Sequence, residues 1–73
     1  MPLSGYRQAV RVLITPPDRD GRRWRIQIEP RRIRIYELLG RSIAADGPVL
    51  PGIAELGAWL VAQGIDADTL IEV

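Results

Sequence analysis

The sequence predicts a small α+β domain, rich in β-strand, in which an N-terminal hairpin and further strands accompany one short helix. Two observations support this fold class. Apolar residues alternate with arginine along several short runs, which is typical of strands with one buried face, and one apolar segment near the C-terminus ends at a glycine, as helices often do. A chain of 73 residues provides one domain, residues 1–73.

The first two strands are expected to form the hairpin. The alternation predicts a strand from Tyr6 to Thr15, in which Arg7 and Arg11 share one face. Residues 16–21, Pro-Pro-Asp-Arg-Asp-Gly, form the loop, because proline cannot continue a ladder of hydrogen bonds and Asp and Gly favour turns. The second strand, from Arg22 to Glu29, has the clearest alternation in the chain.

Two interpretations are open for the segment after the turn at residues 30–31. The alternation from Arg32 to Tyr36 predicts a third strand. Pro30 and Gly40 would instead bracket a helix from Arg31 to Leu39, since proline suits the first helical position and glycine follows helix ends. The β-branched residues favour the strand.

The C-terminal half predicts a connection, one helix and a last strand. Residues 41–52 contain Asp-Gly-Pro and Pro-Gly and are expected to be a connection. Residues 53–56 fit a short strand or the lead into a helix, and a helix is expected from Gly57 to Gln63, stopped by Gly64. Residues 69–73 are predicted to form a strand.

The net charge of +1 conceals a strong asymmetry. All ten basic residues are arginines, and they lie between Arg7 and Arg41 with four acidic residues, which gives this stretch a charge of +6. Residues 42–73 have five acidic residues and no basic one, a charge of −5. The asymmetry indicates an anionic partner for the basic half, or association of opposite halves. The guanidinium group suits bidentate phosphate recognition, although a GC-rich genome would also replace lysine by arginine.

Strand periodicity would gather these arginines on one surface. If the first three strands form one antiparallel sheet, Trp24 and the isoleucines 26, 28, 33 and 35 face the core. The opposite face would bind the phosphate backbone of RNA or DNA, and Tyr6 and Tyr36 could stack on bases. The predicted nucleic-acid-binding residues are Arg7, Arg11, Arg23, Arg25, Arg32 and Arg34.

The chemistry available for catalysis or metal binding is limited. With no cysteine and no histidine, the chain offers no disulfide, thiolate or imidazole ligand, and we expect no metal and no small-molecule cofactor. Glu29, within the arginine surface, is a candidate general base, with Glu37 second, but we assign no catalytic residue. Asp18 and Asp20 fit a plain turn, and Asp66 and Asp68 fit a turn cap.

The segment from Pro51 to Ile65 resembles the SymE-type toxins, whose domain is a swapped-hairpin barrel related to AbrB and MazE. The matching residues are Pro51, Ile53, Gly57, Trp59, Leu60, Ala62, Gly64 and Ile65. The alternating residues 70–73 and the run from Arg31 to Ile35 extend the similarity over about Arg31 to Val73. Two features depart from the family pattern: the chain stops where the family has a further strand, and its N-terminal hairpin lies outside the motif. The resemblance implies a dimeric, barrel-like, cytoplasmic nucleic-acid-binding protein of a toxin–antitoxin system.

Length and hydropathy complete the expectations. A domain of this size buries only about 60% of its unfolded surface, so we expect a homodimer. The chain has no apolar run near the roughly 20 residues that a spanning helix needs and no signal-peptide pattern, so we expect a cytoplasmic protein and no membrane partner. Whether the protein also cleaves RNA is open. The alternative function is a protein–protein interaction module, such as a small phage or accessory protein, that docks an acidic partner or self-associates through opposite charges.

Overall fold

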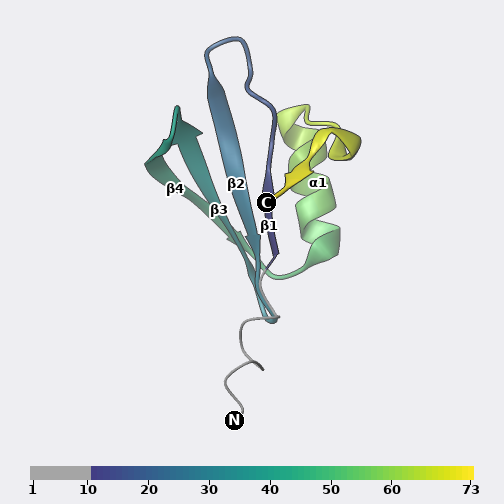
Figure 1. The fold of residues 1–73 in the computed structure, drawn as a ribbon. Helices are drawn as coiled ribbons and strands as arrows, with labels where there is room; N and C mark the ends of the chain where they lie inside the picture. Colours follow the sequence, from purple (N-terminus) through teal and green to yellow (C-terminus); the bar gives the residue numbers. More distant parts are fainter. Residues whose placement is uncertain (1–10) are drawn as a thin grey trace.

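The computed structural model describes residues 11–73, which form a five-stranded antiparallel sheet and one α-helix (Figure 1). The strands are β1 (Arg11–Ile14), β2 (Arg22–Ile28), β3 (Ile33–Leu39), β4 (Ser42–Leu50) and β5 (Ile71–Glu72). The helix is α1 (Ile53–Gln63), and a short 3₁₀ turn, η2 (Ala67–Thr69), precedes β5. The predicted combination of a hairpin, further strands and one helix is therefore confirmed.

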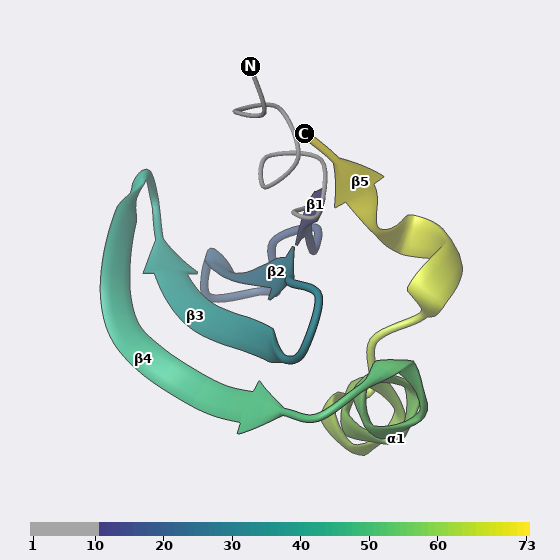
Figure 2. The same cartoon turned by 90° about the horizontal axis from the view of Figure 1, so that it is seen from below.

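The strands are ordered β4-β3-β2-β1-β5, so β2 lies at the centre of the sheet and β4 and β5 at its edges. Directly paired residues of antiparallel strands share a face. Ile26 pairs with Leu13 and Ile35, and these side chains lie on the face that packs against α1, which we call the helix-facing face. We call the opposite side the outer face. In Figure 2 the strands curve, α1 lies on one side of them, and the sheet does not close into a barrel.

The core lies between the helix-facing face and α1. Ile26, Ile33 and Ile35 are at most 2% exposed, and Leu56 and Leu60 of the helix complete the buried cluster. Partly buried side chains pack around it, among them Trp24 and Trp59, whose rings meet edge to face with centroids 5.3 Å apart. The core residues predicted from the alternation are thus confirmed.

The predicted N-terminal hairpin is present in the described residues. β1 pairs with β2 from Arg11 to Ile14, and the part of the predicted first strand before residue 11 lies outside the described residues. The loop turns at Asp18, whose carboxylate accepts hydrogen bonds from the backbone N–H groups of Asp20 and Arg22 at 2.8 and 2.9 Å. This is the plain turn that the sequence predicts, and the hydrogen bond from Arg22 is the main cause that lowers the pKa of Asp18.

The segment after the turn at residues 30–31 is a strand, so the alternative helix from Arg31 to Leu39 is wrong. β3 pairs with β2 along its whole length, and the pairing buries Ile33 and Ile35 against α1. A helix would present these two isoleucines and the intervening arginine at 100° intervals, whereas the strand places both isoleucines on one face.

The predicted connection over residues 41–52 is also wrong in its main part, because Ser42–Leu50 is the nine-residue strand β4. Its turn-forming residues are accommodated by a register shift between Arg34 and Tyr36 of β3, and a second shift lies between Glu37 and Leu38. β4 is an edge strand, where a proline costs no ladder hydrogen bond on its free side. Asp-Gly-Pro here marks a bulge within a strand and not a loop.

The C-terminal elements follow the prediction with shifted bounds. The helix begins at Ile53, so residues 53–56 are its first turn, and Gly64 ends it with a left-handed φ of 73°. Asp66 accepts a hydrogen bond from the Asp68 N–H at 3.0 Å and so caps η2, as predicted. The last strand is only two residues long and pairs with β1. Among residues 11–73, no helix has the length and apolar character that crossing a membrane requires.

Candidate nucleic-acid interface

The outer face of the sheet is formed by the residues of β2 and β3 that alternate with the core. Arg23 pairs with Leu38, Arg25 with Tyr36, and Gln27 with Arg34. No helix of the described residues lies over this face. It therefore presents a band of long polar side chains around the ring of Tyr36, together with the apolar Leu38, which pairs with Arg23 and is only 7% exposed.

The structure brings together four of the six predicted site residues. Arg23, Arg25 and Arg34 lie on the outer face, and Arg32, in the β2–β3 turn, is paired with Glu29 at its end. Arg7 and Tyr6 lie outside the described residues.

Arg11 does not belong to this surface, so its predicted place beside the other arginines is wrong. It pairs with Ile28, a residue of the helix-facing face, and forms a bidentate contact with Glu72 of β5 at 3.0 and 3.1 Å. Arg11 alternates within β1 as predicted, but the face of the sheet that it joins depends on the register between β1 and β2, which β1 alone does not contain. The contact also pairs one charge of the basic half with one of the acidic half inside the same chain.

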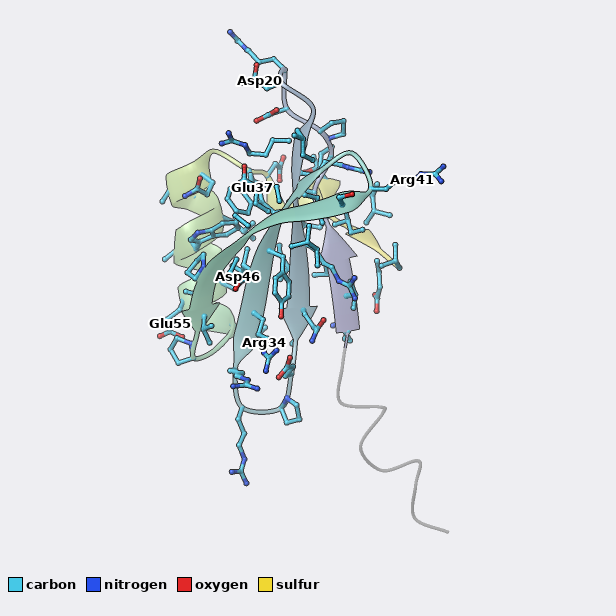
Figure 3. All side chains as sticks on the ribbon, turned by 90° about the vertical axis from the view of Figure 1, so that its left-hand side faces the viewer. Asp20, Arg34, Glu37, Arg41, Asp46 and Glu55 are labelled. Carbon is cyan, nitrogen blue, oxygen red and sulfur yellow. The ribbon has the colours of Figure 1, made fainter. Side chains whose placement is uncertain are left out.

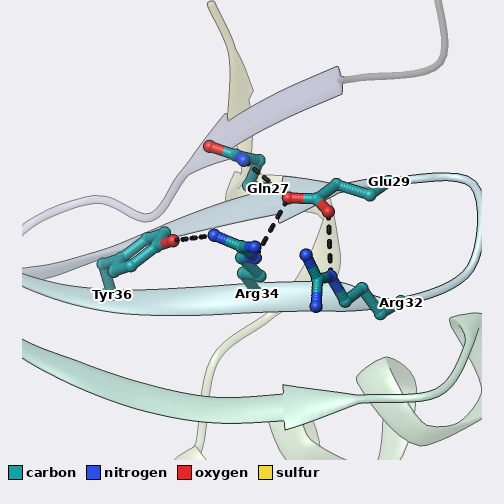
Figure 4. A network of polar contacts seen from close by, with 5 residues as sticks. All are labelled: Gln27, Glu29, Arg32, Arg34 and Tyr36. Atoms are coloured by element: carbon teal, nitrogen blue, oxygen red, sulfur yellow. Dashed lines mark hydrogen bonds and ion pairs between the residues drawn. The ribbon is translucent and has the colours of Figure 1, made fainter. Parts of the chain in front are cut away.

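Glu29 organises the end of the outer face near the β2–β3 turn (Figure 4). Its carboxylate accepts hydrogen bonds from Arg32 Nε at 3.0 Å and from Gln27 Nε2 at 2.7 Å, and Arg34 Nε lies 3.3 Å away. The hydrogen bonds from Arg32 and then Gln27 hold the pKa of Glu29 below its ordinary value of 4.5. Two guanidinium groups thus share one carboxylate, and the cluster retains a positive charge.

Arg34 also connects this cluster to the aromatic ring. Its Nη1 donates a hydrogen bond of 3.3 Å to the Tyr36 hydroxyl. That bond, followed by the charge of Glu29 and, more weakly, that of Asp46, raises the pKa of Arg34. A guanidinium has five N–H donors, and these contacts leave donors of Arg32 and Arg34 free for an anion.

The other two arginines of the outer face have few partners of their own. Arg23 donates to the carbonyl oxygen of Gly40 at 3.0 Å. Arg25 lies between Ile14 and Tyr36 in the ladder, and its Nε is buried with no hydrogen-bond partner in the described part of the chain. No carboxylate of residues 11–73 forms an ion pair with either residue. Their charges are therefore the least compensated on this face.

A groove of about 320 Å³ lies beside these residues, between β3 and β4. Arg32, Arg34 and Tyr36 line it from β3 and the turn before it, and Asp46 and Val49 line it from β4. Tyr36 and Asp46 are direct partners across the two strands, and Figure 3 shows Arg34 and Asp46 on these neighbouring strands. The groove therefore combines guanidinium groups, an aromatic ring and a carboxylate.

Sequence reasoning missed Asp46 and Val49, because the predicted connection contained them. Their pairing with β3 depends on a bulge that contains Gly47 and Pro48. The sequence of β4 has no alternation of apolar and polar residues that would predict this bulge. The one available signal was the pair of apolar residues Val49 and Leu50 before Pro51, which is too short to distinguish a strand from a loop.

The acidic residues considered for catalysis or metal binding are engaged elsewhere. Glu37 forms an ion pair with Arg22 at 2.6 Å, toward the end of the sheet opposite the β2–β3 turn. Within residues 11–73, no three acidic side chains gather as a metal site would require.

Comparisons with protein-family models, with curated proteins and with solved structures find no match to this chain.

Proposed function

We propose that the protein binds nucleic acid through the outer face of its sheet. The observation that carries the proposal is the gathering of Arg23, Arg25 and Arg34 on the face that α1 leaves uncovered, with Arg32 at its end. Such a surface binds phosphates by releasing condensed counterions, and the affinity then falls steeply as salt rises. Tyr36, in the middle of the arginines, adds a ring on which a base can stack.

We favour binding without catalysis. A general base works best when its pKa lies near the working pH, and the arginine and glutamine contacts of Glu29 move its pKa in the opposite direction. The carboxylate also directs its oxygens to Gln27, Arg32 and Arg34, and not to open solvent.

The assembly and the biological setting are part of the same proposal. The resemblance of residues 31–73 to the SymE-type toxins supports a cytoplasmic homodimer from a toxin–antitoxin system. In such a dimer the open sheet of one chain would be completed by the second copy. Sedimentation would test this directly: a mass of twice 8.2 kDa is expected.

A second candidate function, a protein–protein interaction module, is favoured by the exposed side of α1. Ile53 is 64% exposed and Val61 is 80% exposed, although both are large apolar residues. Large apolar residues exposed along a helix are typical of docking surfaces. This side of the molecule lies away from the outer face, so separate variants distinguish the two functions.

The experiment that tests the proposal is fluorescence anisotropy with labelled single-stranded RNA and duplex DNA, at low and moderate salt. The outer-face variant is Arg25→Gln with Arg34→Gln. The control is Arg19→Gln with Arg41→Gln, which removes the same charge from two exposed loop arginines. Glutamine keeps a polar side chain and places no like charge beside Glu29.

The proposal predicts that the outer-face variant loses at least tenfold in affinity and about two units of the logarithmic salt slope, whereas the control loses much less. Equal losses in the two variants would show that net charge alone attracts the nucleic acid. If neither RNA nor DNA binds at low salt, the proposed function is wrong and the docking function of α1 becomes the better account.

A further inference from the structure

The groove between β3 and β4 contains one group that phosphate binding does not explain. Asp46 is exposed, and it lies within a surface otherwise suited to anions. The ion pairs of residues 11–73 engage Glu29, Glu37 and Glu72, and none engages Asp46. The charge of Asp46 acts on Arg34 through space, but among residues 11–73 its carboxylate oxygens have no ion-pair partner. A carboxylate weakens phosphate binding nearby, so its position opposite Tyr36 favours a ligand with N–H donors.

The neighbours of Asp46 restrict the charge of that ligand. The guanidinium groups of Arg32 and Arg34 line the same groove and would repel an ammonium or guanidinium ligand. The ligand should therefore offer N–H donors without a positive charge and carry an anionic group at a short distance. A nucleotide has both properties, since its base can donate and its phosphate is negative.

The aromatic ring and the aliphatic side chain of the groove fit a planar base. Tyr36 and Val49 line it from opposite strands, and the Tyr36 ring is held by the hydrogen bond from Arg34 to its hydroxyl. Stacking on such a ring accepts any base, so the carboxylate must provide the discrimination.

Gly47 allows the two strands to come close enough to form this groove. A Cβ atom at position 47 would lie 2.8 Å from the carbonyl oxygen of Ile35, which is closer than a side chain tolerates. The glycine therefore keeps β4 against β3 at the bulge next to Asp46. The volume of about 320 Å³ is at the lower end of the range of small-ligand sites and is enough for one base.

We propose that the groove binds an unpaired guanine, with the base stacked on Tyr36, its N1–H and N2–H groups donating to the Asp46 carboxylate, and Arg32 and Arg34 binding the adjacent phosphate. Guanine is the base whose Watson–Crick edge presents two adjacent N–H donors, which match the two oxygens of one carboxylate. In a duplex that edge is occupied, so the ligand is a single strand or a free guanine nucleotide. The inference rests on the proposed function of the outer face.

The experiment compares decamers of uridine that carry guanine, inosine or adenine at one central position. A bidentate contact contributes about 1–3 kcal/mol of discrimination, so guanine should bind about 5- to 150-fold more tightly than adenine. Inosine keeps N1–H but lacks the N2 amino group, and its affinity should lie between the two. Competition with GMP separates the sources: displacement at micromolar GMP assigns the groove to a free nucleotide, and displacement only at millimolar GMP assigns it to a strand.

Substitution of Asp46→Asn separates recognition from simple repulsion. The variant should lose the preference for guanine while its affinity for the adenine decamer stays the same or rises, because a negative charge has left a basic surface. The matched control is Asp20→Asn, which removes a carboxylate from the loop between β1 and β2. This variant should retain the preference for guanine. Equal gains for all decamers in the Asp46→Asn variant would mean that the carboxylate only repels phosphate.

Substitution at Tyr36 tests the stacking contact. Tyr36→Phe keeps the ring and should bind within a few-fold of the original protein, whereas Tyr36→Leu should lose about tenfold or more on every decamer. Thermal unfolding of both variants shows whether each remains folded. Decamers that bind equally, whatever their central base, would overturn the guanine site and leave the proposed function standing; absence of binding by all of them would overturn both.

Discussion

The two faces of the sheet are made from alternate residues of the same strands, yet they differ in charge and in how deeply most of their side chains are buried. The helix-facing face buries Ile26, Ile33 and Ile35 almost completely. The outer face carries arginines that are only partly buried and are held by ion pairs and hydrogen bonds to Glu29, Tyr36 and the Gly40 carbonyl. Because successive residues of a strand point to opposite faces, the residues that stabilise the fold and the residues that carry charge are separate. Substitutions on the two faces should therefore affect different measurements.

The largest expected effect is on the helix-facing face. Ile26 is fully buried at the centre of the sheet, so Ile26→Ala should lower the free energy of unfolding by about 2–5 kcal/mol. Val49→Ala, at a site that is 62% exposed on the outer side, should cost less than about 1 kcal/mol. Urea unfolding of both variants makes the comparison, and similar losses would contradict the separation of the faces.

A smaller effect is expected where β4 approaches β3. Gly47→Ala brings a Cβ atom within 2.8 Å of the Ile35 carbonyl oxygen, so the strands must move apart, at a cost of about 1–3 kcal/mol. The same variant should lose its preference for guanine, because the groove is displaced. A fully stable Gly47→Ala protein would show that β4 does not lie against β3 at this bulge.

A gain in stability is expected when a glycine on the exposed side of α1 is replaced by alanine. A Cβ atom at Gly57 meets no atom within 4 Å, and alanine favours helix over glycine by about 1 kcal/mol. Gly57→Ala should therefore stabilise the protein by about 0.5–1 kcal/mol and leave nucleic-acid affinity unchanged. Thermal unfolding with an anisotropy titration tests both statements. If stability falls instead, position 57 does not have the open space that the structure gives it.

The smallest expected effect comes from acidification. The pKa of Glu29 is lower in the folded protein than its ordinary value of 4.5, so the ion pairs contribute fully above that pH. As pH falls below 4.5 the unfolded chain takes up the proton first, and the contribution is lost as pH falls through the folded-state pKa. Thermal unfolding between pH 7 and 2.5 should show this decline, and Glu29→Gln should show a shallower one. Identical pH profiles would mean that Glu29 makes no net ion pair.

The helix-facing face could be predicted from the sequence because its signal is local. Alternation along β2 and β3 identified Trp24 and four isoleucines as core, and each is buried or packed against the buried cluster. The hairpin loop, the left-handed glycine at the end of α1 and the cap at Asp66 have equally local signals in their residue types.

The outer face could be predicted only in part, because its composition depends on registers between strands. Arg23, Arg25 and Arg34 follow from the period of two, whereas the position of Arg11 depends on which residue of β2 it faces. Asp46 reaches the groove through a bulge in β4, and the residue types of this segment indicate turns. Pairing information of this kind is not present in any single strand.

The most direct test of the separation of the two faces is NMR of the arginine Nε–Hε groups during titration with single-stranded RNA. We expect the resonances of Arg25 and Arg34 to shift most. Arg11, held by Glu72 on the helix-facing side, and Arg19, in the loop between β1 and β2, should shift little. Large shifts of Arg11 or of the backbone amides of α1, with Arg25 and Arg34 unchanged, would show that RNA binds the helix-facing side and not the outer face.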